Sequence, residues 1–236
     1  MSGRLPVVTL DGPAGAGKST LARRVAERLG LACLDTGAMF RCLALKLGPG
    51  AELLPGEELR GRCGQWTFSI AGRGRDTALL CNGQPLRDEV RTEEAGMLAA
   101  RIGAVPAVRE VLRRAQRAMG EQSPLVAEGR DMGTVVFPDA RFKFFLDAAP
   151  EARAMRRLRD LESRGVHTEL AALTERILRR DALDRNRAEA PLRPARDALI
   201  VDTSRLDIEG VLDVMLRHID GHGGARALRT RMDSRP

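Results

Sequence analysis

The stretch Gly12-Pro-Ala-Gly-Ala-Gly-Lys18-Ser19 satisfies the pattern G-x-x-x-x-G-K-[ST] in full. A β-rich run from Leu5 to Leu10 precedes it, and a helical apolar pattern follows from Lys18 to about Leu29. Between a strand and a helix, such a loop folds its main-chain N–H groups around a β-phosphate, and the helix adds its N-terminal dipole. The stretch therefore predicts a nucleoside-triphosphate site in an α/β fold.

The lysine and the serine of this loop have distinct expected roles. Lys18 bridges β- and γ-phosphate oxygens, and the Ser19 hydroxyl ligates Mg²⁺. Among 39 basic residues only Lys18, Lys46 and Lys143 are lysines, which favours a phosphate role for Lys18 over a glycine-rich turn with a surface lysine. The residues expected to bind ATP through this loop are Gly12, Pro13, Ala14, Gly15, Ala16, Gly17, Lys18, Ser19 and Thr20.

Outward from the loop, the pattern alternates between short strands and helices. Further strands are expected at 124–127, 142–146 and 198–201. Helices are expected to open at 35–37 and run to about 47, to span 92–120 with a new helix starting at Pro106, and to span 150–165 and 169–190. A last helix follows the strand at 198–201 and runs through about 218. Strand-like segments at 66–70 and 77–81 instead indicate a small β-rich insertion. We expect a three-layer α/β/α fold with a parallel sheet of about five strands, the insertion at about 60–90 and a helical lid.

A carboxylate and an arginine follow the strand expected at 124–127. Glu128, at the end of that buried strand, can orient a Mg²⁺-bound water, and Arg130 can reach toward the phosphates. The alternative is a strand end with exposed charges, which would be the ordinary interpretation without the phosphate loop nearby.

A second charged group comes from the helix expected at 169–190. Arg180, Asp184 and Arg187 have the spacing i, i+4, i+7 and share one face of that helix. Two guanidinium groups can clamp phosphates, and the carboxylate beside them can accept a hydrogen bond from a ribose hydroxyl. On spacing alone, a solvated helix with internal ion pairs explains the pattern better.

The class of phosphate-loop protein follows from what surrounds the loop. The chain has no N-K-x-D motif of a GTPase, and at 236 residues it is short for a large ATPase or helicase. Arginine-rich helices after the third strand suit a small-molecule kinase, in which a lid closes over the phosphates and excludes water.

The amino-acid composition of the chain limits which kinds of molecule it is expected to bind. The net charge is +7, but the aromatic content is 3% with no tyrosine, which argues against stacking on nucleic-acid bases. Four separated cysteines (Cys33, Cys42, Cys63, Cys81) form no zinc or disulfide pattern.

Without a signal peptide or a membrane-spanning stretch, a cytoplasmic setting is expected. Residues 219–236 suggest a flexible basic tail, with RNA contact as the alternative.

With these motifs assembled, the chain resembles a bacterial-type cytidylate kinase, a nucleoside monophosphate (NMP) kinase, from about residue 7 to about 218. The resemblance is carried by four segments: Asp11 to Ser19, Leu34 to Arg41, Glu128 to Asp139, and Arg180 to Pro191. It implies phosphorylation of CMP and dCMP to CDP and dCDP by ATP with Mg²⁺, in a monomeric chain with no membrane or nucleic-acid partner.

The resemblance also implies roles for individual residues. Lys18, Arg130, Arg180 and Arg187 would be catalytic. Ser19 and Glu128 would hold Mg²⁺, Glu128 through water. ATP contacts would also come from Arg156 and Arg157 of the lid and from Thr203 near the adenine. The CMP-binding set would be Thr36, Arg41, Arg109, Arg130, Asp131, Arg180, Asp184 and Arg187, with Arg109 and Asp131 at the cytosine edge.

Four positions depart from the family pattern. Phe40 stands where tyrosine is frequent, and Ala100 where a base-contacting serine is expected. Ser19 and Glu128 replace glycine and aspartate, and both keep the magnesium chemistry intact. The segments expected are a core at 1–36, 121–150 and 191–218, an NMP-binding region at 37–120 and a lid at 151–190.

The residues alone are compatible with two other functions. A kinase for another small acceptor, such as UMP, shikimate or dephospho-coenzyme A, would share every phosphate-loop feature. An ATP-dependent RNA- or ribosome-binding protein would explain the positive charge, although the chain lacks stacking aromatics.

Overall fold

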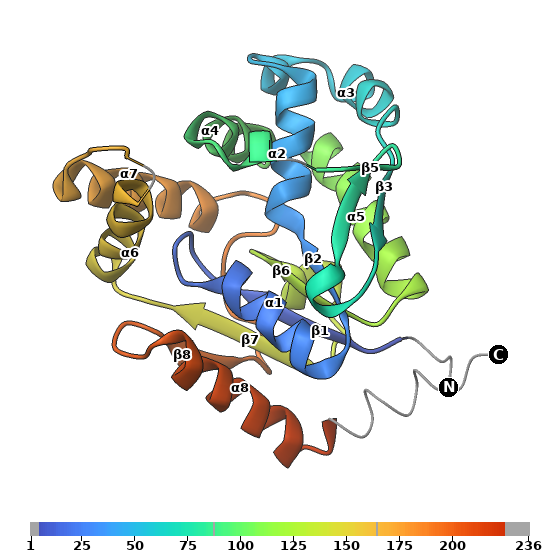
Figure 1. The fold of residues 1–236 in the computed structure, drawn as a ribbon. Coiled ribbons are helices and arrows are strands. Elements are labelled where there is room, and N and C mark those ends of the chain that lie inside the picture. Colours follow the sequence, from blue (N-terminus) through green and yellow to red (C-terminus); the bar gives the residue numbers. More distant parts are fainter. Residues whose placement is uncertain (1–4, 87, 164, 225–236) are drawn as a thin grey trace.

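Five parallel strands form the central sheet, in the order β2-β6-β1-β7-β8 (Figure 1). The computed structural model of the chain describes residues 5–86, 88–163 and 165–224. The strands are β1 (Val7–Asp11), β2 (Ala32–Asp35), β6 (Leu125–Gly129), β7 (Phe142–Asp147) and β8 (Leu199–Asp202). The predicted parallel α/β fold is confirmed. Strand β2 is the one strand of this sheet that the sequence pattern does not predict.

Helices cover both faces of this sheet, which gives the predicted three layers. One apolar cluster packs α1 (Lys18–Leu29) and α8 (Ile208–Gly221) against the sheet. A second packs α2 (Thr36–Leu47), α3 (Gly56–Cys63), α4 (Glu93–Ile102) and α5 (Pro106–Gln122) on the other side. Strands buried on both faces are rich in apolar residues, which makes β1, β6 and β7 visible in the sequence although Thr9 interrupts β1 and Lys143 interrupts β7.

The register of the strands gathers acidic residues at one edge of the sheet. Asp11 lies opposite Gly129, and Asp35 lies opposite Glu128. The phosphate loop leaves the sheet at the same edge, directly after Asp11. In open parallel sheets this carboxyl edge is where ligands bind, so the fold itself brings the predicted site residues together.

A small antiparallel sheet forms the insertion. Its strands are β3 (Phe68–Ala71), β4 (Ala78–Cys81) and β5 (Gln84–Pro85), with a turn in which Asn82 has φ +48°. Short 3₁₀ helices occupy Ala51–Leu53, Gly74–Asp76 and Asp88–Arg91. The two main strands are confirmed, but the β-rich part begins at Phe68. Helix α3 was missed because only Leu59 and Cys63 give it a buried face.

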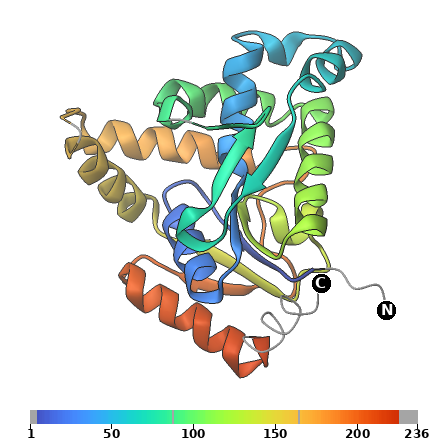
Figure 2. The same cartoon turned by 45° about the vertical axis from the view of Figure 1, so that its right-hand side comes forward.

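Helices α6 (Pro150–Glu162) and α7 (Leu170–Arg185) pack against each other at one side of the molecule (Figure 2). Their shared core contains Ala154, Leu161 and Leu173, and α7 lies alongside α4. These two helices form the region predicted as a lid.

Helix α7 ends at Arg185, five residues earlier than predicted. The N–H of Asn186 still bonds the Ala182 carbonyl, but the N–H of Leu192 bonds the Asp184 carbonyl and turns the chain back. Ala190 has φ +50°, outside helical values, and Pro191 could not continue a helix. The prediction that Arg187 shares a helical face with Arg180 and Asp184 is therefore wrong.

The last helix extends beyond its predicted end. Helix α8 continues to Gly221, and Ile219 is fully buried, so the expected tail does not begin at 219. Residues 225–236 lie outside the described residues. Over the described part of the chain, every helix is too short or too polar to cross a bilayer. All four cysteines are buried free thiols.

Candidate active site

The phosphate loop needs its glycines for measurable reasons. Gly12, Gly15 and Gly17 have φ values of +147°, +80° and +86°, a region that favours glycine. A Cβ atom at Gly12 would lie 2.0 Å from the Leu146 carbonyl oxygen of the neighbouring strand. The loop is thereby fixed in a tight curve, with the exposed Ser19 and Thr20 in the first turn of α1.

Lys18 lies over this loop. Its side chain is 5% exposed, and its ammonium donates a hydrogen bond of 2.6 Å to the Pro13 carbonyl. Burial, followed by the nearby Arg130 guanidinium, lowers the pKa of Lys18 to about 7. The ammonium is thus held where anionic phosphate oxygens would restore its ordinary basicity.

Glu128 and Ser19 offer oxygen ligands beside the loop. Glu128 is 5% exposed and hydrogen-bonds the Ser19 side chain, while its Oε1 atom has no hydrogen-bond partner in the described part of the chain. Burial and then Asp35 raise the pKa of Glu128. Glu128 thus presents a buried oxygen without a hydrogen-bond partner, next to the Ser19 hydroxyl. This pair fits Mg²⁺, which binds proteins through one or two carboxylates and fills its other coordination positions with substrate phosphates.

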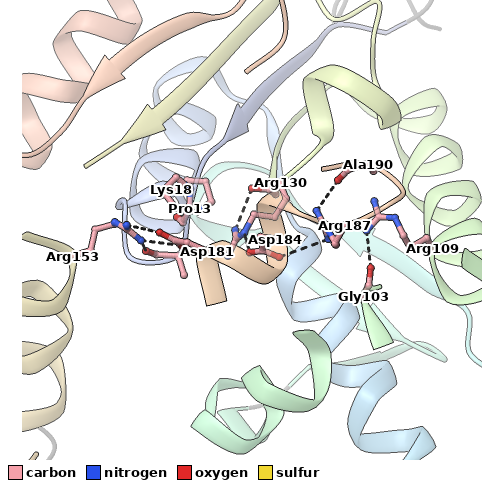
Figure 3. A network of polar contacts seen from close by, with 12 residues as sticks. Pro13, Lys18, Gly103, Arg109, Arg130, Arg153, Asp181, Asp184, Arg187 and Ala190 are labelled. Carbon is pink, nitrogen blue, oxygen red and sulfur yellow. Dashed lines mark hydrogen bonds and ion pairs between the residues drawn. The ribbon is translucent and has the colours of Figure 1, made fainter. Parts of the chain in front are cut away.

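Arginine side chains surround Asp184 of α7. The Arg130 Nε donates to Asp184 Oδ2 at 2.8 Å, and Arg187 Nη1 lies 3.8 Å from Asp184 Oδ1 (Figure 3). Although burial alone would raise the pKa of Asp184, Arg130 and then Arg187 and Arg180 hold it below its usual value. Besides burial and Arg130, Arg180 also lowers the pKa of Lys18.

Arg187 reaches this group from a loop and not from the helix. Its Nη2 donates to the Ala190 carbonyl at 2.8 Å, which folds the side chain back toward Asp184 (Figure 3). The predicted clustering of Arg180, Asp184 and Arg187 therefore exists, although the helical spacing that led to it does not.

A buried ion pair lies on the other side of Arg187. Arg109 Nη2 donates to Asp131 Oδ2 at 2.5 Å and Nη1 donates to the Gly103 carbonyl at 3.1 Å, and both side chains are less than 9% exposed. Burial raises the pKa of Asp131, and the Arg109 charge opposes that rise. The Phe40 ring lies 5.8 Å from the Arg109 guanidinium and forms an apolar wall.

The start of α2 holds two more predicted residues at the same edge. The Thr36 hydroxyl donates to the Glu128 carbonyl at 2.7 Å, and Arg41 pairs with Asp35 at 3.3 Å. Asp35 also caps α2 by accepting the Ala38 N–H at 2.8 Å. A Cβ atom on Gly37 would lie 2.9 Å from Arg41 Nη1, so this glycine leaves room for the arginine.

The two arginines predicted to belong to a lid differ in position. Arg156 donates to the hydroxyl and the carbonyl of Thr203, and the Thr203 hydroxyl lies 3.5 Å from the Ala16 carbonyl of the phosphate loop. These two predicted residues therefore meet at the loop. Arg157 bonds Asp160 of its own helix at 2.7 Å.

Sequence reasoning missed two buried charges. Asp11 accepts the N–H groups of Met132 and Gly133 at 2.8 and 2.7 Å, and so fixes a π-helical segment (Met132–Val136) directly after Asp131. Arg153 was one arginine among many in α6, but it is 2% exposed and contacts the phosphate loop. For Asp11, its place as the last residue of a buried strand was an available signal.

Comparison with known proteins agrees with this geometry. The family model for cytidylate kinase matches residues 8–221. A cytidylate kinase of Nitratidesulfovibrio vulgaris is 59% identical over 220 residues, covering 93% of this chain and 95% of that protein. Cytidylate kinases of Oleidesulfovibrio alaskensis and Vibrio cholerae are 52% and 45% identical, covering 89% and 93% of this chain and 96% and 98% of theirs. The chain belongs to the cytidylate kinase family.

Proposed function

We propose that this chain transfers the γ-phosphoryl group of ATP to CMP and dCMP, giving CDP and dCDP. Membership of the family makes the chain a nucleoside monophosphate kinase. The observation that carries the reaction is the convergence of Lys18, Arg130 and Asp184 at the carboxyl edge of the sheet. Phosphoryl transfer depends chiefly on positioning and on positive charge around the moving group, and this edge supplies both.

The phosphate loop and Lys18 would hold the triphosphate. Main-chain N–H groups of residues 12–20 bind the β-phosphate, and the Lys18 ammonium spans the β- and γ-oxygens. Ser19 and Glu128, the latter through water, would hold Mg²⁺, which when bound neutralises phosphate charge. Arg156 and Thr203 would border the adenine end of the ATP site, together with Arg157 from the lid.

The acceptor needs no general base, because a CMP phosphate oxygen is already anionic and nucleophilic. Arg41 and Arg130 would orient that phosphate, and Thr36 would line its pocket. Arg180 and Arg187 would neutralise charge on the transferred group, while Asp184 keeps Arg130 and Arg187 in place and accepts a ribose hydroxyl.

Base recognition would come from Arg109 and Asp131. Cytosine presents N4–H₂ as a donor and O2 and N3 as acceptors, so one carboxylate and one guanidinium complement its edge. Uracil would instead turn its O4 acceptor toward a buried carboxylate, which costs about 1–3 kcal/mol. Ala100 supplies no hydroxyl to the base, so this pair carries most of the discrimination.

The surroundings of the reaction are part of the proposal. We propose that the chain works as a monomer in the cytoplasm, with small-molecule substrates and no membrane or nucleic-acid partner. Residues 37–120 would move with the bound CMP, and residues 151–190 would close over ATP. The phosphate loop at 1–36 and the remaining strands at 121–150 and 191–218 would form the fixed core.

A coupled assay of ADP release tests the function. The acceptors to compare are CMP, dCMP, UMP, shikimate and dephospho-coenzyme A, each with Mg·ATP and again with excess EDTA. CMP and dCMP should give the fastest turnover, and EDTA should stop it. Lys18→Ala should abolish turnover, whereas Lys46→Ala, at an exposed lysine of α2, should retain it. Faster turnover of any other acceptor would refute the assignment.

A further inference from the structure

Arg153 in the first turn of α6 is among the most deeply buried side chains of the described residues. Burying an arginine is costly unless its donors are all used. Arg153 uses three nitrogens: Nε donates to the Ala148 carbonyl at 2.9 Å, and Nη1 to the Ala14 carbonyl at 3.0 Å. Both Nη atoms also bond the Asp181 carboxylate, at 3.1 and 2.5 Å.

These acceptors belong to three different parts of the molecule. Ala148 follows the end of β7, Ala14 lies in the phosphate loop, and Asp181 lies in α7. The first turn of α6 also presses on the loop, because a Cβ atom on Gly15 would lie 3.1 Å from Arg153 Cβ. One guanidinium group therefore joins the loop that grips ATP to the helix that carries the lid charges (Figure 3).

Helix α7 is fixed at two carboxylates one turn apart. Asp181 bonds Arg153 at the phosphate loop, and Asp184 bonds Arg130 at the end of β6. Arg180 directly precedes Asp181 in α7. The way in which Arg153 holds α7 at Asp181 therefore also sets where the Arg180 side chain begins.

We propose that Arg153 and Asp181 are a positioning pair that couples the lid helix to the phosphate loop, so that Arg180 reaches the transferred phosphoryl group. Neither residue touches substrate. The inference rests on the proposed function, since it takes Arg180 as a catalytic cation. A buried ion pair is weak evidence for stability, and the multiple acceptors on separate elements point to alignment as its use.

The test compares Arg153→Lys, Asp181→Asn and the double variant with the unchanged protein. Lysine keeps the charge but cannot reach Ala14, Ala148 and Asp181 together. We expect kcat to fall by at least about 10-fold, toward the roughly 100-fold that a 1 Å misplacement costs, with KM for CMP changed less than about 3-fold. The double variant should be no slower than the slower single variant, because both break one unit.

Two controls separate alignment from mere folding. Glu175→Gln breaks the exposed Arg179–Glu175 pair (2.6 Å) on the same helix and should leave kcat unchanged. Thermal unfolding and calorimetric ATP binding give the fraction of folded, binding-competent protein to which kcat is normalised. Unchanged normalised kcat in Asp181→Asn, a substitution of equal size, would overturn the coupling even if Arg153→Lys does not fold. If the unchanged protein fails to phosphorylate CMP, the proposed function fails instead.

Discussion

Charged side chains that other proteins leave in water are buried around the phosphate loop of this one. Lys18, Glu128 and Asp131 are each 5% exposed or less, and burial shifts the pKa of each toward the neutral form. Arg109 compensates the burial of Asp131, whereas at Lys18 the Arg130 charge adds to the effect of burial. For Lys18 the arrangement is therefore costly in the absence of substrate and becomes favourable when phosphates arrive, so binding energy is directed to the site of reaction.

The pKa of Lys18 predicts a pH dependence for ATP capture. Burial lowers that pKa from 10.5 to about 7, so above pH 7 the free protein loses the ammonium charge that attracts phosphate. Bound phosphates favour the charged form and raise the pKa again. We expect kcat/KM for ATP to fall as pH rises from 7 to 8.5, up to about tenfold per pH unit, while kcat at saturating ATP stays flatter.

The measurement is a pH series with Mg²⁺ in excess, which keeps the protonation state of the donor constant. Lys18→Arg is the matched variant, because a guanidinium stays charged throughout this range. Its profile should be flat, at lower absolute activity. A kcat/KM for ATP that is constant from pH 6.5 to 8.5 in the unchanged protein would contradict the role of the Lys18 charge.

Asp131 carries the prediction for base selectivity. Asp131→Ala and Asp131→Asn remove the carboxylate that would accept the cytosine amino group and oppose uracil O4. The ratio of kcat/KM for CMP to that for UMP should fall roughly 5- to 150-fold, which corresponds to about 1–3 kcal/mol of lost discrimination. Because the ratio is independent of the folded fraction, loss of stability from leaving Arg109 unpaired does not affect it. Asp139→Asn, outside the proposed site, serves as the control. An unchanged ratio in both Asp131 variants would remove Asp131 from the base site.

At the scale of elements, the ends of the strands position the chemistry. Thr36, Glu128 and Asp131 all come within three residues of a strand end. The Thr36 hydroxyl donates to the Glu128 carbonyl, and the Arg109 side chain holds Asp131. Gly129 shows how close these parts are, since a Cβ atom there would lie 2.7 Å from the Thr36 hydroxyl. The site is therefore rigid where strands end and depends on α6 and α7 for the charges that approach from outside.

A substitution at Asp11, the last residue of β1, tests whether the ends of the strands position the site. Its two carboxylate oxygens accept the N–H groups that begin the segment after Asp131. Asp11→Asn would turn an NH₂ group toward one of these buried donors, at a cost of about 1–3 kcal/mol in the free energy of unfolding. We also expect a higher KM for CMP, because Asp131 loses its support.

Urea unfolding and CMP kinetics measure the two effects of Asp11→Asn. Asp213→Asn, at an exposed position on α8, is the control and should change neither quantity. If Asp11→Asn unfolds at the same urea concentration as the unchanged protein, Asp11 does not hold the segment after Asp131.

The elements that the sequence predicted are those whose local pattern and burial agree. Strands β1, β6 and β7 are mostly apolar, and the glycines of residues 12–17 require one loop geometry. Helix α3 was missed because only Leu59 and Cys63 give it a buried face. The end of α7 was misplaced because the Leu192 N–H bonds the Asp184 carbonyl and turns the chain back. Likewise, nothing in its local pattern separates Arg153 from Arg156 and Arg157. Only the tertiary contacts to Ala14 and Asp181 distinguish it.

For the molecule as a whole, the two apolar clusters are joined through the central sheet. Along β6, Val126 packs into the cluster with α1 and α8, while Leu125 and Ala127 pack into the cluster with α2 to α5. Phe68, Ile70 and Leu79 attach the small antiparallel sheet to the second cluster. Because neither cluster keeps its sheet face without the other, the described residues should unfold together.

This coupling predicts one thermal transition whose midpoint reports on nucleotide binding. A ligand at about 100 times its Kd stabilises the folded state by about 2.7 kcal/mol, and a chain of this size gains roughly 2–4 °C in Tm for each kcal/mol. Mg·ATP should therefore raise Tm by about 5–11 °C, and Lys18→Ala should lose most of that rise while Lys46→Ala keeps it. Calorimetry with and without Mg·ATP measures both. Two separate transitions would show that the sheet does not join the clusters. If Mg·ATP raised the Tm of Lys18→Ala as much as that of the unchanged protein, ATP would be bound without the Lys18 ammonium, and the phosphate loop would lack its assigned cation.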